Sequence, residues 1–133
     1  MTCDDANFPG WATLPLPPSL NAAYANRSLG TKGKGRFSTK AHADWVHEAG
    51  WMLNAAKVRP VYGRYSIRIA VNDKMRGDID NRCKPILDLL VNHGITPDDK
   101  FLWSLTIYRS AKVDRKTVKF RIEHISDTAA SLW

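Results

Sequence analysis

The sequence predicts one small α/β (α+β) domain, in which a mixed β-sheet is packed by two main helices. Two observations lead to this prediction. The chain of 133 residues has the length of a single domain, and its 44% hydrophobic residues are enough to bury a core. Segments with the period of a strand and of a helix follow in the order strand, helix, strand, helix, strand, strand. We expect one domain over residues 1–133, with a core at about 12–125 and flexible tails at 1–10 and 126–133.

The first half of the chain predicts a strand, a helix and a second strand. The proline-blocked run at residues 14–18 is typical of an edge strand that leads into a loop. Residues 39–56 predict an amphipathic helix, because apolar residues recur at helical spacing. Trp45 and Trp51 are both expected on a face of this helix or in the core, since buried aromatic side chains are the commoner case. Residues 65–71 alternate between apolar and polar side chains, which indicates a strand with one buried face.

The second half predicts a helix and two further strands. Residues 81–93 carry an apolar stripe at helical spacing, although Pro85 requires the helix to begin late or to kink. The runs 101–108 and 118–122 have the composition of strands, joined by a loop rich in basic residues. Trp103, like Phe101 beside it, is expected to pack against the sheet.

The charge of the chain favours an anionic partner. Lys and Arg number 20 against 13 Asp and Glu, so the net charge is +7. Such an excess is typical of proteins that contact a phosphate backbone, although two solvated loops would explain the same clusters. The basic residues gather in two segments, the glycine-rich residues 27–40 and residues 109–121, and both are candidates for contact with phosphate. The residues expected to bind DNA are Arg27, Lys32, Lys34, Arg36, Arg76, Lys112, Arg115 and Lys116.

Several classes of protein are disfavoured. No apolar run approaches the ~20 residues of a membrane span, so we expect a protein of the cytoplasm without a membrane partner. Cys3 and Cys83 are too few for a disulfide framework or a structural zinc site, and both are expected as free thiols. The glycine-rich segment 30–37 lacks the Gly-Lys-Ser/Thr of a P-loop, so no nucleotide cofactor is expected.

The most informative segment lies between the strand at 65–71 and the following helix. Asp78 and Asp80 are two residues apart, and at the end of a strand such residues would point the same way. Carboxylate oxygens suit a hard cation such as Mg²⁺. The alternative is that Asp80, Lys84 and Asp88, four residues apart, form a surface ladder of ion pairs worth less than about 1 kcal/mol. The turn that ends in Asp98 and Asp99 could supply a third acid, or both residues could simply be part of a turn after Pro97.

The ordered motif resembles the RusA family of Holliday junction resolvases. It consists of Asp78-x-Asp80-Asn81, Lys84 and Asp88, followed by Gly94 and then Asp98-Asp99. The resemblance extends from about Leu14 to Ile125 and includes the early proline-rich run. It implies catalytic roles for Asp78, Asp80, Lys84 and Asp99, with the three acids as ligands of one or two Mg²⁺ ions.

The resemblance also implies a function. The family's activity would be that of a homodimeric, Mg²⁺-dependent endodeoxyribonuclease that cuts branched DNA, namely four-way junctions, during DNA recombination and repair in a bacterial or phage setting. Two alternatives remain open. One is a basic DNA-binding protein without catalysis, and the other is a metal nuclease that acts on other branched DNA.

Overall fold

The computed structural model describes residues 10–18, 24–26, 36–38 and 40–126. Its centre is a four-stranded mixed sheet in the order β1-β6-β4-β5. Strand β6 pairs antiparallel with both β1 and β4, whereas β4 and β5 run parallel. The strands are β1 (Ala12–Pro15), β4 (Tyr65–Asn72), β5 (Leu102–Ser110) and β6 (Thr117–His124).

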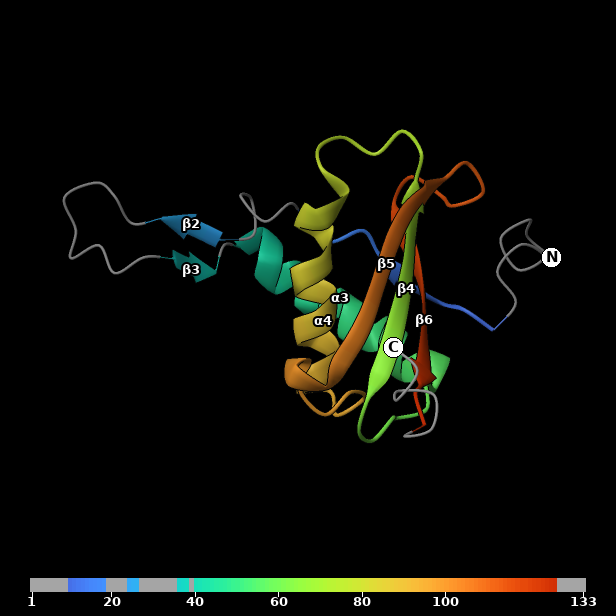
Figure 1. The fold of residues 1–133 in the computed structure, drawn as a ribbon. Helices are drawn as coiled ribbons and strands as arrows, with labels where there is room; N and C mark the ends of the chain where they lie inside the picture. The colour runs from blue at the N-terminus through green and yellow to red at the C-terminus, as the bar shows by residue number, and fades with distance from the viewer. Residues whose placement is uncertain (1–9, 19–23, 27–35, 39, 127–133) are drawn as a thin grey trace.

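Two helices, α3 (Lys40–Ala56) and α4 (Cys83–Asn92), cover one face of this sheet (Figure 1). The core lies between them and the strands, and it includes Trp45 and Leu53 of α3, Ile86 and Leu90 of α4, and Phe120 of β6. The mixed sheet with two helices confirms the predicted fold class. Among the described residues, no helix is long and apolar enough to cross a membrane.

Helix α3 buries Trp45, Ala49 and Leu53, which recur at helical spacing. Trp45 is buried, and its indole Nε1 donates a hydrogen bond of 2.8 Å to the carbonyl oxygen of Pro15, which ties the helix to β1. Trp51 lies on the outer face of the helix and not in the core, because the residue is 72% exposed. It lies two positions before Leu53 and therefore about 200° away from it around the helix. Gly50 allows a close approach of α4, since a Cβ there would lie 3.1 Å from His93 Nε2.

A short hairpin was not predicted. Strands β2 (Tyr24–Asn26) and β3 (Arg36–Ser38) pair antiparallel in a separate two-stranded sheet, and they flank the glycine-rich segment. Strands of three residues are too short to show an alternating pattern, so no periodicity in the sequence indicates them.

The predicted helix at 81–93 is divided into two parts. A 3-10 turn, η1 (Ile79–Arg82), leads into α4, so the α-helix begins late, as Pro85 requires. Pro85 is the third residue of α4, where a backbone N–H has no partner within the helix. Gly94, with a φ of +73°, follows the end of the helix.

The last two strands are longer than predicted. Much of the basic segment that was expected to form the loop between them belongs to the strands themselves. Residues 109–121 span the end of β5, a turn and more than half of β6, and Lys119 is buried and donates a hydrogen bond of 2.7 Å to Thr13 Oγ1. The prediction that Trp103 packs against the sheet is wrong in part. Trp103 is 43% exposed, and its ring lies 5.3 Å from the guanidinium carbon of Arg64.

Candidate active site

The candidate site begins in the loop that joins β4 to η1. Asn72 ends β4 with a buried side chain, which donates a hydrogen bond of 2.6 Å to the carbonyl of Val113 and accepts one of 2.8 Å from the backbone of Lys74. Met75 is buried in the core. Gly77 has a φ of +85°, a conformation that favours glycine, and it turns the chain into η1.

Two arginine side chains hold the backbone of this loop. Arg109 of β5 donates hydrogen bonds to the carbonyl oxygens of Asp73, Met75 and Gly77 at 3.3, 2.6 and 2.8 Å. Arg82 of η1 donates to the carbonyl oxygens of Arg76, at 3.2 Å, and of Pro17. Neither residue was predicted to belong to the site, because an arginine that binds backbone carbonyls has no sequence signature.

Asp78 and Asp80 lie at the start of η1, and both are exposed. Asp78 is the N-cap residue with an extended backbone, and its side chain makes no capping hydrogen bond. Asp80 is in the first turn. The expectation that strand geometry aligns the two carboxylates is wrong, because β4 ends at Asn72, six residues before Asp78. The two acids are instead presented by a 3-10 turn at the entrance to α4.

Cys83, one turn after Asp80, is an inert thiol rather than a nucleophile. Burial, and secondarily the negative charge of Asp80, raises the pKa of Cys83 to about 11. The side chain is 7% exposed. Its thiolate fraction at neutral pH is therefore very small.

We therefore expect Cys83 to resist alkylation by iodoacetamide at pH 8 in the folded protein. It should react fully after denaturation, since both causes of the raised pKa are lost on unfolding. Mass spectrometry of the digested protein would assign the label to Cys83 and separate it from Cys3, which lies outside the described residues. Rapid labelling of Cys83 under native conditions would contradict the buried position.

Lys84 is the second residue of α4 and forms an ion pair with Asp88. Its Nζ lies 3.0 Å from Asp88 Oδ1, and the two side chains are 58% and 34% exposed. Of the predicted ladder of ion pairs, the pair between Lys84 and Asp88 is therefore present. Helix α3 contains a pair with the same spacing, Lys40 and Asp44, at 2.9 Å.

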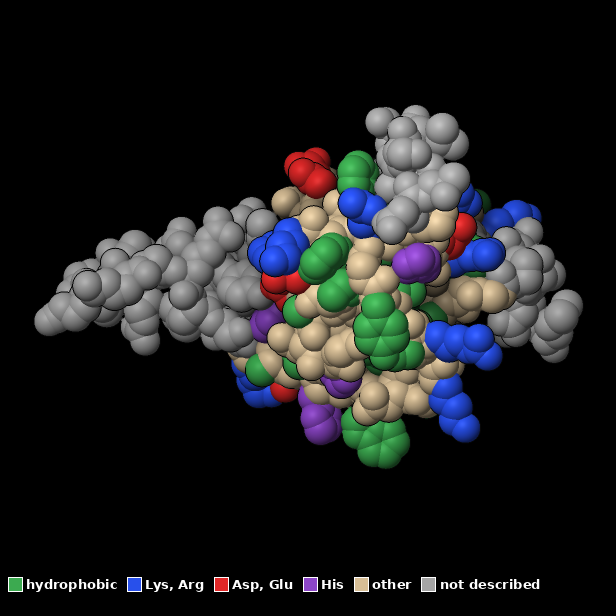
Figure 2. Space-filling view, turned by 60° about the horizontal axis from the view of Figure 1, so that its bottom comes forward, with side chains coloured by type: hydrophobic (Ala, Val, Ile, Leu, Met, Phe, Trp, Pro, Cys, Tyr) green, Lys and Arg blue, Asp and Glu red, His purple; other side chains and the backbone are tan. Residues whose placement is uncertain are grey.

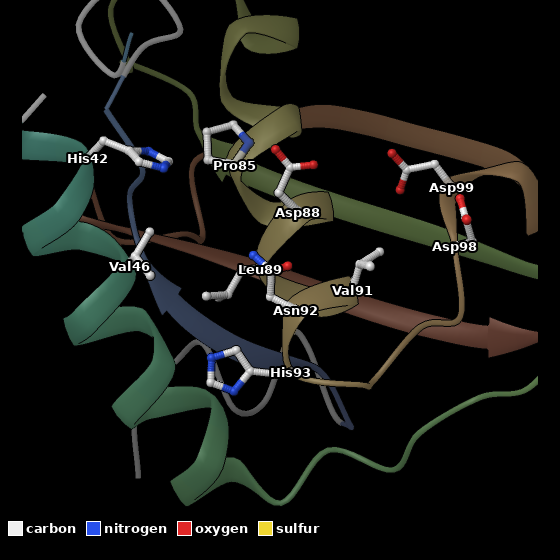
Figure 3. A pocket seen from close by; sticks show the side chains of 10 residues that line it. All are labelled: His42, Val46, Pro85, Asp88, Leu89, Val91, Asn92, His93, Asp98 and Asp99. Carbon is white, nitrogen blue, oxygen red and sulfur yellow. The ribbon is translucent and has the colours of Figure 1, made fainter. Parts of the chain in front are cut away.

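Asp99 lies with Asp88 at a pocket of about 430 Å³ between α3, α4 and η2 (Asp99–Phe101). Asp88, Asp98 and Asp99 line its α4 and η2 side, and His42 lies on α3 across from them (Figure 3). Asp98 caps η2, because its side chain accepts a hydrogen bond of 3.2 Å from the Lys100 backbone. The turn interpretation is therefore correct for Asp98.

The three predicted acids come from the two 3-10 turns that precede and follow α4. Asp78 and Asp80 lie at the start of η1, before α4, whereas Asp99 follows α4 in η2 and lines a pocket with Asp88. Within the described ranges, no group of three or more His, Cys, Asp and Glu side chains could hold a metal ion. A ligand role for Asp99 beside Asp78 and Asp80 stays a prediction.

The residues predicted to bind DNA are only partly described. Arg27, Lys32 and Lys34 lie outside the described residues, and Arg36 begins β3. Arg76 is exposed in the loop before Asp78. Lys and Arg side chains are spread over the face seen in Figure 2 rather than gathered in one patch. The turn between β5 and β6 presents three further exposed basic residues, Lys112, Arg115 and Lys116.

The chain matches a known protein family. The family model described as endodeoxyribonuclease RusA matches residues 15–123, which include the loop after β4, both turns and α4. No curated protein matches the chain.

Proposed function

Because this chain belongs to the RusA family of endodeoxyribonucleases, we propose that it is a Mg²⁺-dependent homodimer that resolves four-way DNA junctions. Its reaction would be the hydrolysis of one phosphodiester bond by each subunit. The setting would be DNA recombination and repair in the cytoplasm of a bacterium, encoded by the host or by a phage.

The observation that most supports this proposal is the pair of exposed carboxylates beside a lysine. Asp78 and Asp80 are accessible at the entrance to α4, and the Asp78 side chain is not used as a helix cap. Mg²⁺ is often bound by one or two carboxylates and several waters, so this donor set fits the ion. Lys84 follows four residues after Asp80 on the first turn of α4.

Asp78 and Asp80 would hold Mg²⁺, which when bound supplies an activated water and neutralises charge on the phosphate oxygens. Lys84 would place its ammonium group against the phosphate and offset the negative charge that develops during displacement. Asp99 is proposed to supply a third carboxylate ligand to the metal. Arg76, next to the carboxylates, would hold the neighbouring phosphate of the DNA backbone.

The dimer follows from the geometry of the substrate. A four-way junction is resolved by two opposed nicks, and a two-fold dimer presents two equivalent sites to a substrate with matching symmetry. Lys112, Arg115 and Lys116 on the β5–β6 turn are exposed and would contact the junction arms.

We expect the purified protein to cut a labelled four-way junction in the presence of Mg²⁺ and to stop cutting when EDTA removes the metal. Cutting should be at least about tenfold faster for the junction than for linear duplex of the same sequence, because the proposed dimer engages two strands at once. Gel electrophoresis of end-labelled strands measures both rates.

The two alternatives give different results in the same assay. A basic DNA-binding protein would bind the junction in a salt-dependent manner but leave it uncut at every Mg²⁺ concentration. A nuclease for other branched DNA would cut flaps or nicked duplex faster than the junction. Either result would refute the proposed function.

A further inference from the structure

We propose that Arg109 is a positioning residue of the active site, which fixes the loop that carries Asp78 through hydrogen bonds to its backbone. The inference rests on the proposed function, since it gives Asp78 and Asp80 their role as metal ligands. It assigns to Arg109 a task within the protein, whereas the sequence places this residue in a cluster expected to face phosphate.

The hydrogen bonds of Arg109 are directed at alternate residues of one segment. Its Nη1 donates to the carbonyls of Asp73 and Met75, and its Nη2 donates to the carbonyl of Gly77. A guanidinium group presents a rigid, planar set of donors, so three carbonyls held by one such group are fixed relative to one another. Arg109 lies opposite Val71 in the parallel register of β4 and β5, so the bonds tie the loop to the sheet.

The start of η1, which carries Asp78, is held by contacts other than a side-chain cap. An aspartate at an N-cap position commonly accepts a hydrogen bond from the first turn, but the Asp78 side chain makes none. Two side chains hold the segment before it: Arg109 of β5 binds the carbonyl of Gly77, and Arg82 of η1 binds the carbonyl of Arg76. The carboxylate of Asp78 is thereby left available while the backbone immediately before it is fixed.

A purely structural role for Arg109 makes a different prediction from a positioning role. If Arg109 only stabilised the fold, its loss would lower the melting temperature and leave the metal dependence of cleavage unchanged. If it positions the carboxylates, its loss would weaken metal binding, because the ligands would no longer be held in one arrangement. Loss of a group that orients metal ligands commonly costs about 10- to 100-fold in metal affinity or activity.

The test compares Arg109→Ala, Arg109→Lys and the control Arg68→Ala. Arg68 is an exposed arginine of the neighbouring strand β4, so its removal costs the same single positive charge. For each variant, junction cleavage is measured over a Mg²⁺ titration, and junction binding is measured in EDTA. Hydrogen exchange of residues 73–80 reports on the loop independently of cleavage.

We expect Arg109→Ala to raise the Mg²⁺ concentration for half-maximal cleavage about tenfold or more, with faster exchange in the loop and junction binding close to that of Arg68→Ala. Arg109→Lys should recover only part of the activity, because an ammonium group cannot hold three carbonyls in one plane. It also serves as the test variant if Arg109→Ala does not fold.

Two results would overturn the inference. One is a Mg²⁺ requirement of Arg109→Lys and Arg109→Ala equal to that of Arg68→Ala. The other is unchanged hydrogen exchange in residues 73–80. Failure of the proposed function is a different result: in that case the wild-type protein itself would cut no DNA. Failure of the inference on Arg109 alone would leave cleavage by the wild-type protein intact.

Discussion

Asp80→Asn is expected to abolish junction cleavage while junction binding is retained or becomes tighter. The substitution keeps the shape of the side chain but removes the charge that would hold Mg²⁺, and an amide is a weaker ligand for a hard cation. We expect the cleavage rate to fall by at least about 100-fold, because the activated water depends on the metal. Binding should not fall, since one negative charge is removed from a surface proposed to face phosphate.

The measurement is single-turnover cleavage of a labelled junction, paired with a gel-shift titration. Glu48→Gln is the matched control, because Glu48 is an exposed acid of α3 and loses the same charge. Cleavage by Asp80→Asn at the wild-type rate would exclude Asp80 as a metal ligand. Loss of binding together with cleavage would point to misfolding, which the circular dichroism spectrum of the variant would reveal.

The main elements of the fold could be predicted because their hydrophobic patterns are regular. Tyr65, Ile67, Ile69 and Val71 alternate without interruption, and all four are buried in β4. The hairpin β2–β3 could not be predicted in this way, since three residues do not establish a period. The exposure of Trp51 follows from its angular position on α3, whereas the size of its side chain alone favours burial.

The candidate site was predictable as a set of residue types but not as an arrangement. Asp78, Asp80 and Lys84 are identified by their order in the chain, which resembles a family motif. The distance in space between Asp80 and Asp99 depends on the tertiary structure, and it cannot be calculated from their spacing in the sequence. The backbone contacts of Arg109 have no sequence signal either, because the same residue in a basic cluster equally fits a role in phosphate binding.

Helix stability does not explain the location of Lys84. A lysine in the first turn of a helix faces the positive end of the helix dipole, which disfavours a cation there. The ion pair with Asp88 is partly exposed, and such a pair contributes less than about 1 kcal/mol. The same arrangement of Lys40 and Asp44 on α3 has no acids of a candidate site beside it in the sequence. The position of Lys84 beside Asp80 therefore favours a chemical role over a structural one.

We therefore expect Lys84→Ala to lower the maximal cleavage rate by about 100-fold, with a melting temperature close to that of the wild type. Asp88→Ala should have a smaller effect, and it should add nothing to Lys84→Ala in a double variant, because Asp88 would act on catalysis only by orienting Lys84. Asp44→Ala removes an ion pair of the same spacing from α3 and should cut normally. If Asp88→Ala lowered the rate of the Lys84→Ala variant further, Asp88 would have a role of its own at the pocket that it shares with Asp99.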